Sequence, residues 1–325
     1  MRYEKFKETV LCRIKEFLPE EYQSDSFEYR KTEVVNGTEE MLAVVPSDNG
    51  IVLSLCMRNF YEKYMQFQDI ALVLECMANS IVKLNESKKN YTKSNLRNNV
   101  VIQLVNAKQN EKMLQSIPHR RILDLAMIYK AVTLVEDGMN WMLLNNEMIK
   151  ELSVTEEELY RWAYKNTSRQ FHFSINPMAM QIRKDISKII EDGNMDLYQI
   201  RDLLELLPEH FPEARDDTWT IHTKEGINAS SILLYKSLLD YIAERVEDDF
   251  YIVPLSVNEM VAVSVRTGVL DELEKSLLEV NMGVTEPESR LTNSIYLYDK
   301  DKEKLRIVSK NENSRIDKNV FYIKL

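Results

Sequence analysis

One carboxylate, Asp124, stands where a charged side chain is unexpected. It interrupts a stretch, Ile122–Val132, whose alternating apolar residues predict a β-strand. A carboxylate inside an apolar strand needs a partner, because burying an unpaired charge is costly. His119, Arg120 and Arg121 are near enough in sequence to supply one. Asp124 is therefore a candidate catalytic acid with His119 beside it, and a structural ion pair at a sheet edge is the simpler interpretation.

A second carboxylate, Glu259, follows Asn258 at the start of another predicted strand. It carries the same two interpretations as Asp124. If both acids lined one groove, they would form a site, and the enzyme would be a hydrolase or nuclease that acts through carboxylates.

Metal-dependent and nucleophilic chemistries lack their usual spacings. Metal-dependent nucleases combine an Asp with a Glu-x-Lys pair, but Asp137 with Glu147 and Lys150 has the wrong final spacing. No G-x-S-x-G elbow is present. The histidines lack metal-ligand spacing, so we expect no metal site; they are His119, His172, His210 and His222.

Glycine is scarce, and this excludes the familiar nucleotide-binding loops. Such loops need glycines a few residues apart to bring backbone N–H groups close to phosphate. The nearest pair of the 7 glycines here, Gly37 and Gly50, is separated by 50 − 37 = 13 positions. No Walker, Rossmann or kinase glycine motif is present, and we expect no cofactor.

The charge is acidic overall but uneven. The net charge of 42 − 52 = −10 argues against general affinity for nucleic acid or anionic membranes. The segment 83–121, however, holds nine Lys or Arg against two Glu, a local charge of +7. A solvated face explains such a run most simply; the alternative is a docking patch for an acidic protein or nucleic acid. Its candidate contact residues are Lys88, Lys89, Lys93, Arg97, Arg120 and Arg121.

The sequence indicates a cytoplasmic protein. Its 3 cysteines lie in apolar contexts without C-x-x-C spacing, as expected of reduced, buried thiols. The first residues mix charged and apolar side chains unlike a signal peptide, and no apolar run approaches the ~18 residues of a membrane span.

The elements that must position the candidate residues centre on 118–167. Thr155 and Glu158 fit a capping box, in which each side chain satisfies a free backbone N–H at a helix start. Around this box we predict strands at 122–132 and 141–144, a turn at 136–138, and a helix from 155.

The remaining pattern predicts an α+β fold with mixed, mainly antiparallel sheets, packed helices and two sub-domains. Residues 1–86 should form a helix, a three-stranded meander and further helices, and 87–325 the central and C-terminal units, with 85–99 an exposed connection. The other predicted elements are helices at 4–18, 182–190, 197–207, 228–246 and 269–280, strands at 26–35, 39–45, 51–57, 100–105, 219–223, 250–254 and 260–265, a hairpin at 295–308, and an edge strand at 319–325.

Several short motifs, taken in order, resemble an uncharacterised family of proteins from gut Clostridia. They are Pro118–Arg120 with Leu123–Ala126, Glu158–Tyr160, Gly226–Ser230 and Phe250–Glu259. The resemblance implies a fold and no assigned activity. Members often occur in genomes rich in mobile elements, which implies a role in element biology or phage conflict. Where that family has a Pro-Ser-Ser-Ile-His-Glu-like run, this chain has Asn258 in place of the histidine, which weakens any His-dependent chemistry.

Together these observations favour a non-enzymatic intracellular factor that binds a protein partner. A carboxylate-dependent hydrolase or metal-dependent nuclease is one alternative. A nucleic-acid binder acting through 83–121 is the other, and its affinity should fall steeply with salt.

Overall fold

The computed structural model describes residues 1–47, 52–89, 92–135, 138–178, 180–181, 188 and 217–309. The chain divides into two compact units. The first comprises Met1–Asn98 with Lys150–Val154, and the second comprises Asn99–Ile149 with Thr155–Leu325. The boundary predicted at 86/87 falls inside a helix of the first unit.

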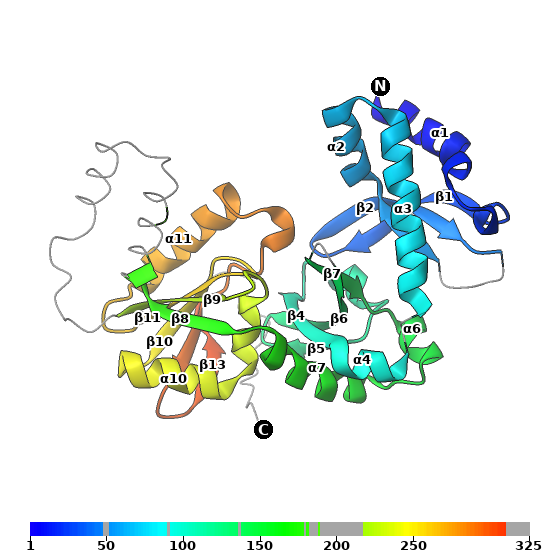
Figure 1. Cartoon of the computed structure of the whole chain (residues 1–325). Helices are drawn as coiled ribbons and strands as arrows, with labels where there is room; N and C mark the ends of the chain where they lie inside the picture. The colour runs from blue at the N-terminus through cyan, green and yellow to red at the C-terminus, as the bar shows by residue number, and fades with distance from the viewer. Residues whose placement is uncertain are drawn as a thin grey trace. The chain divides into compact units, whose positions relative to one another are not determined.

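The first unit is a three-stranded antiparallel sheet with helices (Figure 1). The hairpin predicted at Asn36–Gly37 forms, but its turn lies one residue earlier: Val35 and Asn36 form the tip, with Asn36 in the left-handed region at φ 62°, and Gly37 pairs with Val34. The turn predicted at 48–50 lies outside the described residues. The elements are α1 (Tyr3–Arg13), η1 (Ile14–Phe17), η2 (Glu20–Tyr22), β1 (Ser26–Val34), β2 (Gly37–Val45), β3 (Leu53–Cys56), α2 (Met57–Phe67), α3 (Ile70–Lys89) and α4 (Lys93–Asn99).

Apolar residues at helical spacing form the core of this unit. Apolar residues of α1, η1 and α3 recur three or four positions apart and meet the inward face of β2. The fully buried members are Phe6, Val10, Ile14, Leu42, Leu74, Met77 and Ile81.

The connection predicted over 85–99 is exposed at most of its described positions, but it is largely helical. Helix α3 continues to Lys89, and α4 begins at Lys93. Thr92 caps α4, because its Oγ1 accepts a 3.2 Å hydrogen bond from the Asn95 backbone N–H. Leu96 then anchors this short polar helix by being buried. One buried apolar residue and an N-cap are therefore enough to make this polar segment helical.

The second unit begins with a four-stranded antiparallel sheet in which β6 (Leu125–Val135) pairs with β4 (Val100–Asn106), β5 (His119–Ile122) and β7 (Gly138–Leu143). The single strand predicted at 122–132 is thus wrong at its start. Leu123 adopts φ 54° and turns the chain between β5 and β6. The associated helices are α5 (Glu111–Leu114), α6 (Asn146–Glu151) and α7 (Glu156–Gln170), the last with the predicted capping box.

Side chains protect the outer edge of β4. The Ile102 N–H donates to Thr167 Oγ1 at 2.8 Å, and the Ile102 carbonyl accepts from Asn228 Nδ2 at 2.8 Å. Asn166 Nδ2 donates to the Val100 carbonyl at 2.9 Å. Because an open strand edge invites pairing with other chains, these contacts close it and hold α7 beside the sheet (Figure 1).

A six-stranded antiparallel sheet completes the unit, in the order β13-β12-β10-β11-β9-β8. Leu277 on α11 packs against Val253, Val261 and Ile295 of this sheet region. The elements are β8 (Phe173–Pro177), β9 (Thr218–Thr223), η3 (Ala229–Leu234), α10 (Lys236–Val246), β10 (Phe250–Pro254), β11 (Met260–Ser264), α11 (Leu270–Gly283), η4 (Pro287–Ser289), β12 (Tyr296–Asp299) and β13 (Lys304–Ile307).

One prediction for this region is wrong, and three others cannot be compared with the structure. The long helix expected from Asn228 is two elements, because Tyr235 takes an extended conformation between η3 and α10. The helices predicted at 182–190 and 197–207 and the strand at 319–325 fall largely or wholly outside the described residues.

The α+β class with mainly antiparallel sheets is confirmed. Among the helices in the described ranges, none has the length and apolar character needed to cross a membrane.

Candidate functional site

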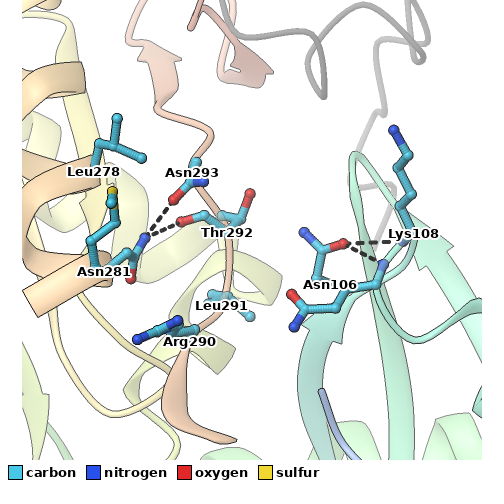
Figure 2. A pocket seen from close by; sticks show the side chains of 10 residues that line it. Asn106, Lys108, Leu278, Asn281, Arg290, Leu291, Thr292 and Asn293 are labelled. Atoms are coloured by element: carbon cyan, nitrogen blue, oxygen red, sulfur yellow. Dashed lines mark hydrogen bonds between the residues drawn. The ribbon is translucent and has the colours of Figure 1, made fainter. Parts of the chain in front are cut away.

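A pocket of about 370 Å³ lies within the second unit. One wall is the turn that follows β4, and the other is the C-terminal half of α11 with the extended segment 290–293 (Figure 2). A volume of a few hundred Å³ is ordinary for a ligand site. The pocket is therefore our candidate functional site.

The turn after β4 is held by its own side chains. Asn106 Oδ1 accepts hydrogen bonds from the backbone N–H groups of Lys108 (3.1 Å) and Gln109 (2.9 Å). Asn110 Nδ2 donates to the Asn106 carbonyl at 2.9 Å. These contacts fix the backbone from which Lys108 and Gln109 reach the pocket.

The opposite wall is fixed by Asn281, a buried amide on α11. Its Nδ2 donates to the Thr292 carbonyl at 3.0 Å and to Asn293 Oδ1 at 2.8 Å (Figure 2). Because both partners are acceptors, they set which end of the Asn281 amide is nitrogen. Asn281 therefore joins the helix to the extended segment.

Asp124 is hydrogen-bonded to this wall of the pocket. Its Oδ2 accepts a 2.6 Å hydrogen bond from Thr292 Oγ1, and its Oδ1 accepts one of 2.8 Å from the Tyr296 hydroxyl. The expectation that His119, Arg120 or Arg121 pairs with Asp124 is wrong. Burial raises the pKa of the Tyr296 hydroxyl well above its ordinary value, with the nearby Asp124 carboxylate adding to the effect, so Tyr296 stays a donor.

An apolar rim borders the pocket. Leu278 and Met282, one helical turn apart on α11, are 43% and 74% exposed. Large apolar side chains that are exposed together commonly mark a binding surface. Arg290 stands on the same wall, and its Nε donates to the Thr285 carbonyl at 2.9 Å.

The lining is rich in hydrogen-bond donors and carries positive charge. Among the described residues that line it, Lys108 and Arg290 are charged and none is an Asp or Glu. Four side-chain amides add donors and acceptors: Asn106, Gln109, Asn281 and Asn293. Amides and cations hold and orient a ligand, whereas acid–base catalysis needs a group that exchanges protons near neutral pH. The arrangement is suited to binding.

The other candidate catalytic residues lie outside this pocket lining. Glu259 is exposed in the turn between β10 and β11, and its backbone carbonyl accepts a hydrogen bond from the Ser256 N–H. His119 is half-buried, and its Nδ1 lies 3.1 Å from the Ile117 carbonyl. Within the described ranges, no three or more His, Cys, Asp or Glu cluster as a metal site would require.

The candidate partner-binding residues are spread over the chain. Lys88 and Lys89 end α3, Lys93 and Arg97 lie exposed on α4, and Lys93 Nζ donates to the Ser153 carbonyl at 3.0 Å. These four belong to the first unit.

Arg120 and Arg121 belong to the second unit. Arg121 is exposed on β5. Arg120 instead binds Glu156 through two parallel hydrogen bonds of 2.8 Å and also contacts Glu157. Its guanidinium is therefore engaged inside the protein rather than presented to a partner.

Sequence reasoning missed most of the pocket. Of its described lining, Asn106, Lys108 and Gln109 fall in the segment 83–121, and only Lys108 is one of the basic residues counted there. One signal was present: α11 carries the adjacent pair Leu277 and Leu278, which point in different directions around the helix, so that one can face the core while the other faces outward. Leu277 is buried and Leu278 is not.

Fold and site together describe an α+β protein with antiparallel sheets and a pocket that is rich in side-chain amides. The chain belongs to a family of unknown function, DUF5688, whose family model matches residues 3–300. Comparison with curated proteins gave no match, and comparison with solved structures gave none either.

Proposed function

We propose that the protein is a non-enzymatic interaction factor that binds a segment of a partner protein across the pocket. The observation that carries this proposal is the exposure of Leu278 and Met282 at the rim of a pocket whose described lining residues include no carboxylate. Apolar side chains with nearby amide donors are what a peptide segment requires, because it offers both side chains and unpaired backbone groups.

A hydrolase acting through Asp124 is less well supported. Both carboxylate oxygens of Asp124 accept hydrogen bonds from hydroxyl groups that belong to the fold. A general acid or base must instead reach the reacting group of a substrate. The contacts of Asp124 are those of a residue that holds two chain segments together.

The biological setting is part of the proposal. The resemblance of short motifs, such as Glu158–Tyr160 and Gly226–Ser230, to an uncharacterised family of gut Clostridia is the support for a partner from mobile-element or phage-defence biology.

The test is affinity capture of the tagged full-length chain from its host, with and without nuclease, read by quantitative mass spectrometry. Leu278→Asp and Met282→Asp place charge on the rim and should reduce recovery of a stoichiometric partner at least tenfold. Val269→Asp is the matched control, because Val269 is 54% exposed beside the start of α11 and does not line the pocket. A partner retained equally by all three variants, or none at all, would contradict the proposal.

A further inference from the structure

Lys130 is a half-buried amine in an apolar part of the second unit. It lies on β6, and the residues directly opposite it on the neighbouring strands are Val101 of β4 and Leu143 of β7. Side chains that are paired in this way lie on the same face of a sheet. The aliphatic stem of Lys130 therefore lies between two apolar side chains, of which Val101 is fully buried.

The ammonium of Lys130 faces an aromatic pair rather than a carboxylate. Its Nζ lies 5.8 Å from the centre of the Trp141 ring, which stacks on Phe171 with 5.7 Å between ring centres. Strand β5 places His119 and Arg121 on the same face, and neither carries negative charge. Among the residues that the structure describes, none forms an ion pair or a hydrogen bond with the Lys130 ammonium. The cation–π contact offsets only part of the cost of withdrawing the charge from water.

We infer that Lys130 is an acyl-acceptor site, at which Nζ takes a small acyl group from an activated donor of the acyl phosphate or thioester class. An amine is a nucleophile only in its neutral form, and an apolar setting without a counterion favours that form. The product is an uncharged amide, so the reaction also removes a charge that the setting disfavours. Lys130 is not among the described residues of the pocket, and its acylation goes beyond the proposed partner binding.

The transfer needs no further co-reactant. The lone pair of the neutral Nζ attacks the carbonyl carbon of the donor and forms the new C–N bond. The bond from that carbon to the phosphate oxygen or thiol sulfur breaks, and the phosphate or thiolate leaves with its electron pair. The proton that Nζ loses passes to the leaving group or to water, and nothing is oxidised or reduced.

The size of the effect follows from the acid–base equilibrium of the amine. Burial lowers the pKa of Lys130 to about 8. At pH 7, about 10% of such an amine is neutral, against roughly 0.04% for an ordinary lysine with a pKa of about 10.4. Part of this advantage is lost, because a less basic group is a weaker nucleophile and because Nζ is partly shielded. We expect acylation at pH 7 to be about tenfold faster at Lys130 than at an exposed lysine.

The test is acetylation of the full-length chain by acetyl phosphate, with the initial rate at each lysine measured by peptide mass spectrometry. Lys112, exposed on α5, is the internal reference, and Lys130 should react about tenfold faster than Lys112 at pH 7. In the folded chain, the rate at Lys130 should reach half its maximum near pH 8 and then level off. In the same chain unfolded in urea, it should keep rising toward about pH 10.4, and the excess over Lys112 should vanish.

Two further measurements connect the reaction to the buried charge. Lys130→Arg keeps a positive charge and should abolish the fast acetylation without creating another fast site. Chain acetylated at Lys130 should unfold at a higher urea concentration than the unmodified chain, because the amide carries no charge.

Several results would overturn the inference. They are equal rates at Lys130 and Lys112 in the folded chain at pH 7, a rate at Lys130 that is half-maximal only near pH 10, and no reaction at Lys130 while Lys112 reacts. An excess at Lys130 that persists in urea would assign the reactivity to the neighbouring sequence rather than to the fold, and would overturn it as well.

Discussion

The Tyr296 hydroxyl donates a 2.8 Å hydrogen bond to Oδ1 of Asp124, across 172 positions of sequence. Tyr296 lies in β12 of the six-stranded sheet, and Asp124 lies in the turn between β5 and β6 of the four-stranded sheet. The other oxygen of the same carboxylate holds Thr292, a pocket residue. Through these two hydrogen bonds, the Asp124 carboxylate connects the four-stranded sheet, the six-stranded sheet and the pocket wall.

Removing this carboxylate should destabilise the second unit. Asp124→Ala leaves the buried Tyr296 hydroxyl without an acceptor, at a cost of about 1–3 kcal/mol in the free energy of unfolding. Tyr296→Phe should cost only about 1 kcal/mol, because Asp124 retains its bond from Thr292. The double variant should lose less than the sum of the two.

Urea unfolding followed by tryptophan fluorescence measures this effect. All three tryptophans, Trp141, Trp162 and Trp219, belong to the second unit, so the signal reports that unit. Asp301→Ala, in an exposed turn, is the control and should change stability by less than about 0.5 kcal/mol. Additive effects of the two substitutions would show that the residues act independently.

Arg120 should matter for stability rather than for binding. Besides its paired hydrogen bonds to Glu156, its guanidinium lies 4.1 Å from the centre of the Tyr160 ring. Arg120→Gln should lower the free energy of unfolding by about 1–3 kcal/mol, because it leaves a half-buried carboxylate without its cation. Arg121→Gln, on the neighbouring exposed position, should be nearly neutral. A fall in partner or oligonucleotide affinity with unchanged stability in Arg120→Gln would restore Arg120 as a contact residue.

Local signals predicted local structure well. The first hairpin forms with Val35 and Asn36 at its tip because Asn36 tolerates the left-handed backbone that a tight turn needs, while Gly37 pairs with Val34. The capping box forms because Thr155 and Glu158 satisfy each other's backbone N–H groups, at 2.9 and 3.2 Å. Each depends on residues within four positions, which a sequence displays directly.

The partners of polar residues were not predictable in the same way. Asp124 binds residues that follow it by 168 and 172 positions, and Asn228 reaches a carbonyl 126 positions away. Nothing in the neighbouring sequence specifies such pairings, because they depend on how strands from different sheets come together. The pocket combines a turn after β4 with the end of α11, and it was missed for this reason.

Lys130 should make stability depend on pH. It lies in β6 between Val101 and Leu143, and its ammonium contacts the Trp141 ring at 5.8 Å from the ring centre. Burial lowers the pKa of Lys130 to about 8. Between that value and the ordinary lysine pKa of about 10.4, the unfolded chain binds more protons than the folded chain, so stability rises with pH there.

Lys130→Met should therefore stabilise the second unit by about 1–3 kcal/mol at neutral pH, where the buried charge is fully present. The gain should shrink as pH rises from about 8 and disappear near pH 10.5. Urea unfolding of both proteins across this range measures it, with the exposed Lys112→Met as control. A stabilisation that stays constant with pH would mean that added apolar packing, and not the removed charge, is responsible.

Two glycines, Gly268 and Gly283, should respond oppositely to the same substitution. A Cβ at Gly268, before α11, would lie 2.9 Å from Tyr251 Cδ2 and 3.1 Å from the Ser264 carbonyl oxygen. One of these atoms is main chain and cannot move alone, so Gly268→Ala should destabilise by about 1–3 kcal/mol.

At Gly283, the last residue of α11, a Cβ meets nothing within 4 Å. Gly283→Ala should therefore stabilise by about 0.4–1 kcal/mol through helix propensity and a less flexible unfolded chain. Thermal unfolding of both variants measures the two effects. A neutral Gly268→Ala would show that Tyr251 and the turn after β11 yield easily, and that the start of α11 is less tightly fixed against its sheet than these distances indicate.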